Sequence, residues 1–182
     1  LRAEKDLWVS VYKEGEEEDK EAARIWLEEV GINPERLAYL GKEDNFWEIG
    51  EGPCGPCSEI YFDWGESHSC GPECRLGCDC DRFVEIWNLV FTQFNKKADG
   101  TYEPLASKNI DTGMGLERVL AILQGGATNY DTDLFKPYIA FLAEKSRLKY
   151  EGADKGTKMA FQVIVDHIRA IVFTLADGVL PS

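Results

Sequence analysis

A long apolar segment, FVEIWNLVFTQF (residues 83–94), lies in the middle of this 182-residue chain. Its odd-numbered and even-numbered positions are both mainly apolar, whereas a strand with one solvated face would alternate apolar with polar residues. The pattern therefore predicts a long strand at the centre of a sheet. Asn88 is an exception, because a buried amide is costly unless it is hydrogen-bonded, either to backbone in the core or to a ligand.

The segments on either side predict further strands and several amphipathic helices. Apolar residues at alternating or helical spacing give these elements. Strands are expected at residues 7–12, 45–49, 58–64 and 101–105, helices at 16–30, 116–123, 133–147 and 159–176, and a turn or short helix at 33–37.

Three segments are expected to lack regular structure. Residues 50–56 contain three glycines and two prolines, which predict a rigid loop. Residues 65–81 have no periodicity and predict an irregular excursion, and residues 109–115 predict a short glycine turn that leads into a helix. The last helix, residues 159–176, is apolar almost all round, so it is expected to be buried or to await a partner.

The composition limits the function classes. The chain has 20 Lys and Arg against 33 Asp and Glu, a net charge of −13, and 44% hydrophobic residues. Enough apolar residues are present for a core, which argues against disorder. The acidity argues against a basic module that binds nucleic acid through phosphate contacts. No apolar run of about 20 residues and no leader are recognised, so no membrane span and a cytoplasmic location are expected.

Six cysteines form two groups. Four of them, at positions 70, 74, 78 and 80, lie within eleven residues, close enough for a tetrahedral Zn²⁺ site. His68 is a candidate substitute ligand, and plain packing of small thiols remains the alternative. The other two, Cys54 and Cys57, form a C-x-x-C inside the Gly/Pro segment. Buried thiols are the favoured interpretation there, over redox catalysis, because no helix start lies nearby.

The stretch DTGMGLER, residues 111–118, carries most of the chemistry. Its two glycines would let a ligand approach the backbone, and the helix that begins there offers free N–H groups to anionic oxygens. Arg118 lies where a guanidinium can bind a phosphate, and the Asp111 carboxylate could bind an ammonium group. Simple helix capping is the alternative for the glycines.

These residues resemble the alanyl-tRNA synthetase family, over essentially the whole chain and in the same order. The segments that carry the resemblance are 45–47, 52–60, 85–91, 111–118 and 166–169. The stretch from Gly113 to Arg118 is similar to motif 3 of the class II synthetases. The resemblance implies an α/β fold of the α+β type, with an antiparallel sheet flanked by helices, here incomplete.

The resemblance also implies roles for individual residues. Asp111 would hold the α-ammonium of alanine, and the remaining alanine-binding residues would be Trp47, Asn88, Val90 and Gly113. Gly115, Glu117 and Arg118 would bind ATP, with Arg118 and Asp111 the catalytic pair. His167 is interpreted as a structural residue, in a cap or an ion pair between helices.

The implied reaction is ligation of alanine to tRNA(Ala) through an alanyl-adenylate, with ATP and Mg²⁺ and, at the cysteines, possibly Zn²⁺. Residues 1–150 would be part of the catalytic domain, with the excursion at 65–81, and residues 151–182 a linker and the start of the helical tRNA-recognition region. Motifs 1 and 2 would precede Leu1, and no editing domain is recognised, so this chain alone is expected to be inactive. The alternative hypothesis is a zinc-stabilised binding module without catalytic activity.

Overall fold

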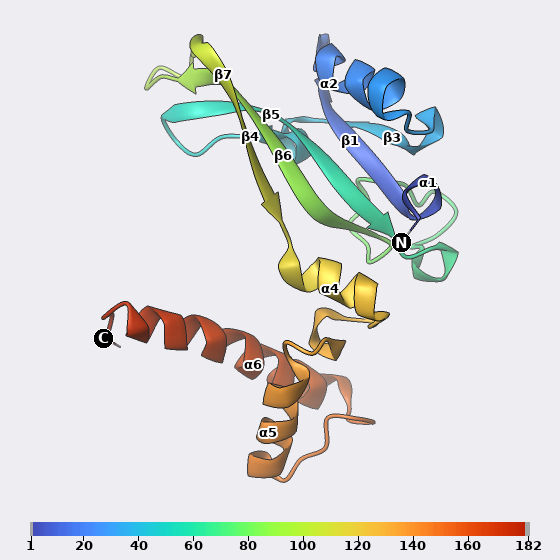
Figure 1. Ribbon diagram of the computed structural model, residues 1–182, viewed down its shortest axis with the longest axis vertical. Helices are drawn as coiled ribbons and strands as arrows, with labels where there is room; N and C mark the ends of the chain where they lie inside the picture. The colour runs from blue at the N-terminus through green and yellow to red at the C-terminus, as the bar shows by residue number, and fades with distance from the viewer. Residues whose placement is uncertain (1, 181–182) are drawn as a thin grey trace. The chain divides into compact units, whose positions relative to one another are not determined.

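The computed structural model describes residues 2–180 and divides them into two compact units, with the boundary after Leu116. The first unit is a sheet with short helices, and the second is helical (Figure 1). The strands are β1 (Leu7–Glu14), β2 (Glu17–Glu18), β3 (Leu37–Leu40), β4 (Phe46–Trp47), β5 (Gly52–Asp63), β6 (Phe83–Lys96) and β7 (Tyr102–Met114).

The sheet has the order β2-β1-β5-β6-β7. These strands pair antiparallel with their neighbours, β4 is antiparallel to β5, and β3 is parallel to β1. The α+β fold with an antiparallel sheet is thus confirmed. As expected, β6 is a central strand, since β5 and β7 pair with its two edges. Short helices flank the sheet, and Val11 of β1 packs against Ala22 and Ala23.

The helices of the first unit are short. They are α1 (Ala3–Asp6), α2 (Lys20–Arg24), a π-helix (Ile25–Val30), α3 (Lys42–Asn45) and 3-10 turns at Pro34–Arg36 and Glu66–His68. The helix expected at residues 16–30 is therefore preceded by β2 and changes to a π-helix half-way. It ends at Gly31, whose φ of 76° is the left-handed conformation that glycine adopts without strain.

The loop expected at residues 50–56 is wrong, because β5 already begins at Gly52. The pairing of β5 with β6 is interrupted between Cys54 and Cys57, and here β5 pairs with β4 instead, Pro56 opposite Phe46 and Gly55 opposite Trp47. Such an irregularity is where a sheet tolerates proline and glycine. A Cβ on Gly55 would lie 1.9 Å from a backbone oxygen of β6, so only glycine fits.

The turn expected at residues 109–115 is also wrong. β7 runs without a break from Tyr102 to Met114, so Asp111 and Gly113 lie in a strand. Pairing with β6 supplies the hydrogen bonds that hold these polar residues in extended conformation. The hairpin expected from residue 101 is confirmed, but its second strand is much longer than predicted.

The second unit contains α4 (Leu116–Gln124), a 3-10 turn (Asn129–Asp131), α5 (Lys136–Ser146) and α6 (Lys155–Ala176). Its core joins Phe135 and Ile139 to Phe161 and Val165 of α6. Residues on both sides of the expected boundary at 150/151 thus share one core, and the functional division at that point stays a prediction.

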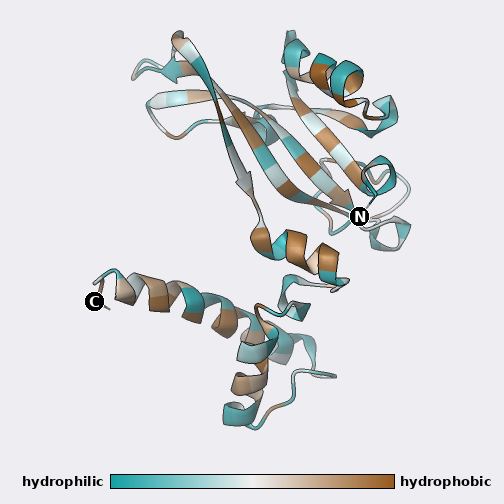
Figure 2. Ribbon diagram, viewed as in Figure 1, coloured by the Kyte–Doolittle hydropathy of each residue, from teal (hydrophilic) through white to brown (hydrophobic). Residues whose placement is uncertain are grey.

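Helix α6 is not buried as a whole. Within the described part of the chain, only Phe161 and Val165 of this helix are buried, and its remaining apolar residues are exposed to varying degrees. Figure 2 shows the hydrophobic stretches along it. By length and composition alone α6 could cross a membrane, but core helices of water-soluble proteins pass the same test.

Candidate active site

Strands β5, β6 and β7 lie side by side in the sheet (Figure 1). Their register brings most of the predicted alanine-binding residues together on one face. The register places Asn88 of β6 opposite Gly113 of β7, and Val90 opposite Asp111. Directly opposed residues of antiparallel strands share a face, as do residues two apart on one strand. β5 extends both rows on the other side of β6. We call the resulting set the three-strand patch, and its members are Cys57, Glu59, Asn88, Val90, Asp111 and Gly113.

The Asn88 side chain is oriented by a buried carboxylate. Its Nδ2 donates to Oε1 of Glu59 at 2.9 Å, and the Tyr61 hydroxyl donates to the other oxygen of the same carboxylate. Burial, together with this bond to Glu59, raises the pKa of Tyr61 well above its usual range, so the phenol stays a donor. The Asn88 Oδ1 is buried and has no partner among the described groups. An acceptor in that state fits a ligand that brings an N–H group.

Sequence reasoning missed Glu59 and Tyr61. A signal was present, because Glu59 is a charged residue within a segment predicted as a strand, and in the structure it is only 7% exposed. Charged residues are seldom buried without a partner. Its partner could not be identified, since the register between β5 and β6 shifts twice.

Trp47 reaches this region from β4, where it pairs with Gly55 of β5 and is 41% exposed. The adjacent Asn45 is completely buried, and its Nδ2 donates to the Cys57 backbone oxygen at 3.0 Å. This bond fixes the short strand β4 against β5. Trp47 therefore has a defined backbone position opposite Gly55, two residues along β5 from Cys57 of the three-strand patch.

Asp111 presents an exposed carboxylate on β7, and the Thr112 backbone N–H donates to its Oδ1 at 2.9 Å. Beside it, Gly113 has extended backbone, and a Cβ there would have no atom within 4 Å. The patch thus offers an anion, an amide oxygen and an apolar side chain, Val90, around a position without a side chain. These groups suit a small ligand with an ammonium group.

The three predicted ATP-binding residues follow directly along the chain. The Gly115 N–H donates to the Ile86 oxygen at 2.9 Å, and α4 then begins at Leu116. Glu117 forms an ion pair with Arg169 of α6. The pKa of Glu117 is lowered by two hydrogen bonds. The larger effect comes from its own backbone, and the smaller from the Arg169 side chain. Arg118 is exposed on α4. Arg169 thus has a structural contact, whereas the structural role expected for His167 stays a prediction.

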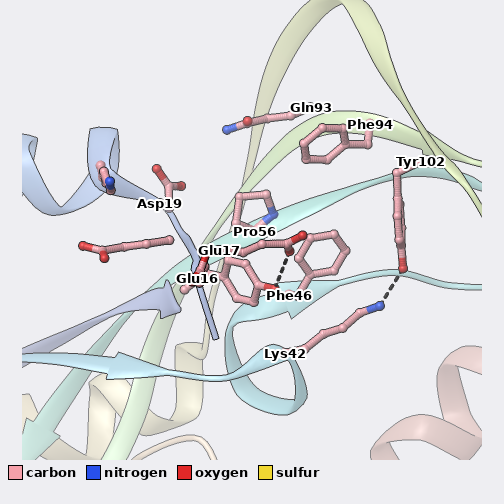
Figure 3. A pocket seen from close by; sticks show the side chains of 12 residues that line it. Glu16, Glu17, Asp19, Lys42, Phe46, Pro56, Gln93, Phe94 and Tyr102 are labelled. Atoms are coloured by element: carbon pink, nitrogen blue, oxygen red, sulfur yellow. Dashed lines mark hydrogen bonds between the residues drawn. The ribbon is translucent and has the colours of Figure 1, made fainter. Parts of the chain in front are cut away.

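A cavity of about 630 Å³ lies elsewhere in the first unit and contains none of the predicted site residues (Figure 3). Aromatic side chains line it together with acidic residues of 16–19. Lys42 Nζ donates to the Tyr102 hydroxyl at 2.5 Å, and that hydroxyl donates to Glu48 at 2.6 Å. Hydrogen bonds from Tyr102, Lys96 and Lys42 lower the pKa of the Glu48 carboxyl to about 2, and the bond from Tyr102 has the largest effect. This network joins the start of β7 to the segment after β4.

The six cysteines are all free thiols. Cys54 and Cys57 are buried, and burial raises the pKa of Cys57 to about 12, which makes it a poor nucleophile and agrees with the buried-thiol interpretation. The sulfurs of Cys70, Cys74 and Cys80 converge in the excursion, whereas Cys78 is not part of that cluster. His68 stacks obliquely near Trp64. A hydrogen bond from Ser69 is the main cause that lowers the pKa of Cys74 to about 7.

Comparison with known families agrees with this arrangement. Residues 2–182 match the family model described as tRNA synthetases class II (A). The chain belongs to this class II synthetase family. The antiparallel sheet is consistent with that membership, and the residues of the three-strand patch lie in the segments that first suggested the resemblance.

Several relatives of this class II synthetase chain are named Alanine--tRNA ligase. The protein of Pelotomaculum thermopropionicum is 56% identical over 177 residues, which are 97% of this chain and 20% of the relative. The Thermoanaerobacter pseudethanolicus protein is 55% identical with the same coverage. The Clostridioides difficile protein is 50% identical over 180 residues, 98% of this chain and 20% of the relative. The chain thus spans about one fifth of the length of these relatives.

Proposed function

We propose that this chain supplies the alanine pocket and part of the ATP site of an alanine–tRNA ligase. The observation that carries the proposal is the register of β6 and β7, which sets Asp111 beside Val90 and Gly113 beside Asn88 on one face. The Asp111 carboxylate would bind the α-ammonium of alanine. The Asn88 oxygen, which has no partner among the described groups, would accept a further hydrogen bond from it.

The same patch would also determine how large a substrate side chain the proposed pocket accepts. Gly113 leaves open space, and Val90 gives it an apolar wall, so the pocket would take a methyl group. Trp47 would close one side and exclude larger side chains. Glycine is harder to exclude, because one missing methyl is worth about 1–3 kcal/mol. Rejection of glycine and serine would therefore need editing elsewhere in the full-length protein.

The reaction would need positioning rather than a covalent enzyme intermediate. A carboxylate oxygen of alanine attacks the α-phosphorus of ATP, the bond to the pyrophosphate oxygen breaks, and alanyl-adenylate and pyrophosphate form. A ribose hydroxyl of the terminal adenosine of tRNA(Ala) then attacks the alanyl carbonyl, and AMP leaves. Holding the two reactants in line and stabilising charge supply the rate enhancement.

Arg118 would stabilise the phosphates of ATP, and the N-terminal end of α4 would favour the same negative charge. Glu117 has carboxylate oxygens, the ligand type that Mg²⁺ prefers. Bound Mg²⁺ would offset the charge of the phosphates. The partners of the full-length protein would be alanine, ATP and tRNA(Ala), in the cytoplasm and without a membrane.

The test measures alanine-dependent ATP–pyrophosphate exchange by the full-length natural protein that contains these residues. Asp111→Asn is compared with Glu103→Gln, an exposed carboxylate on the same strand whose ion-pair partner is Lys97. A hydrogen bond to a charged group is worth about 1.5–3 kcal/mol, so kcat/KM for alanine should fall about 10- to 150-fold in Asp111→Asn. Glu103→Gln should match the wild type.

Two results would contradict the proposal. One is exchange by Asp111→Asn at the wild-type level. The other is the absence of alanine-dependent exchange in the wild-type protein, which would favour the alternative of a binding module without catalytic activity.

A further inference from the structure

The excursion at 65–81 brings three of its four thiols together. The sulfurs of Cys70, Cys74 and Cys80 all lie within 4.8 Å of one another. The Cys74 and Cys80 sulfurs are 3.7 Å apart, far longer than a disulfide bond of about 2.05 Å. Four ligands at about 2.3 Å from a tetrahedral Zn²⁺ have their sulfurs about 3.8 Å apart. The spacing of this pair is that of two ligands of one zinc ion.

We propose that Cys70, Cys74, Cys78 and Cys80 bind one structural Zn²⁺ ion. Cys78 lies on the same short turn, and its sulfur accepts the Arg75 backbone N–H at 3.4 Å. Rotation of this side chain supplies the fourth thiolate. The site is independent of the proposed catalytic function, since none of its residues belongs to the three-strand patch.

The surroundings of the cluster suit a zinc ion with four thiolates, which carries a net charge of −2. The Arg82 guanidinium forms ion pairs with Asp63 and Glu66 and also hydrogen-bonds Cys74, so an N–H donor lies beside the sulfurs. The Arg75 N–H bond to Cys78 adds a backbone donor. Outer donors of this kind orient metal ligands and stabilise their charge.

The excursion has few other interactions that would keep it folded, and one of them is the ion pair between Glu66 and Arg82. Among residues 65–81, all of which the structure describes, Leu76 is the one buried side chain, and a single 3-10 turn is the regular structure. Gly77 packs closely on Leu40 of β3, where a Cβ would lie 3.0 Å from a Leu40 methyl carbon. A small segment with so little core needs a cross-link to be ordered, and a bound metal supplies one.

The first experiment measures the zinc content of the purified protein by elemental analysis after growth with added zinc. For this 182-residue chain we expect one bound zinc ion, which a mercurial releases. All six of its thiols should be titratable after denaturation with a chelator. Cys74→Ser should lose the zinc, whereas Cys54→Ala, which changes a buried thiol outside the excursion, should keep it. Four titratable thiols would show a disulfide, and iron with acid-labile sulfide would show a different centre; either result overturns the proposal.

The second experiment replaces zinc by Co²⁺, and its first measurement uses the wild type alone. The wild type should show the visible bands of tetrahedral cobalt and a thiolate-to-cobalt charge-transfer band. Cys78→Ser should lose about a quarter of that charge-transfer intensity, because one of four thiolates is removed. Full intensity in Cys78→Ser overturns the four-cysteine site, and so does a wild type that binds neither zinc nor cobalt.

Discussion

The substitution Gly113→Ala tests the proposed alanine pocket, because it should weaken the use of alanine without destabilising the sheet. The backbone at Gly113 is extended and a Cβ there meets no atom within 4 Å, so alanine fits the folded chain. Replacing glycine by alanine at a compatible position stabilises a protein by about 0.4–1 kcal/mol through the unfolded state. The new methyl would nevertheless occupy the space opposite Asn88 that the substrate methyl is proposed to fill.

The magnitude follows from the cost of one extra methyl in a filled pocket, about 1–3 kcal/mol. At about 1.4 kcal/mol for each tenfold change, kcat/KM for alanine should fall about 5- to 150-fold. Glycine lacks the clashing methyl, so discrimination against glycine should decrease in the same variant. KM for ATP should stay near the wild-type value.

The assay is pyrophosphate exchange by the full-length natural protein with alanine and with glycine, accompanied by thermal unfolding of the same samples. A variant with wild-type melting temperature and unchanged kinetics for both amino acids would refute the placement of Gly113 in the pocket. A variant that unfolds would refute the claim that its Cβ has free space.

Three further predictions concern stability and reactivity. Gly55→Ala should lower the free energy of unfolding by at least about 1–3 kcal/mol in urea titrations, because its Cβ would lie 1.9 Å from a backbone oxygen of β6; wild-type stability would contradict that close approach. The Glu48 carboxyl has a pKa of about 2 against an ordinary 4.5, so its stabilising effect is complete above about pH 4.5 and lost as the pH falls towards 2. Tyr102→Phe should flatten this dependence in urea midpoints measured across the range, and an unchanged slope would show that the bond is not made. In chelator-treated protein near pH 8, iodoacetamide should modify Cys74, which lies in the largely exposed excursion, before the buried Cys57, with a pKa of about 12, as followed by mass spectrometry; equal rates would contradict the burial of Cys57.

Much of the fold could be predicted from hydrophobic pattern, and the errors have a common physical cause. The central strand β6 and helix α4 were predicted nearly to the residue, because their apolar periodicity is strong. The segments 52–56 and 109–114 were predicted as irregular from their prolines, glycines and polar residues. Both are strands, since pairing with β4 and β6 supplies hydrogen bonds that local composition does not reveal.

Only part of the proposed site could be predicted from the sequence, and the reason is again that strand pairing is not visible in local composition. Resemblance to known motifs supplied Asn88, Val90, Asp111 and Gly113, and the register shows that they share one face. Glu59 was missed, although it orients Asn88, because two register shifts in β5 decide which residue lies opposite the amide. A pattern of residue types along one strand does not encode such a shift.

The most direct test of the central claim is to locate where a stable alanyl-adenylate analogue binds, by NMR chemical-shift changes in the full-length natural protein labelled at side-chain amides and methyl groups. The three-strand patch predicts shifts of the Asn88 amide and the Val90 methyls, and no change in the cavity that contains Tyr12 and Phe46. Shifts confined to that cavity, with the Asn88 and Val90 signals unmoved, would contradict the assignment of the alanine pocket.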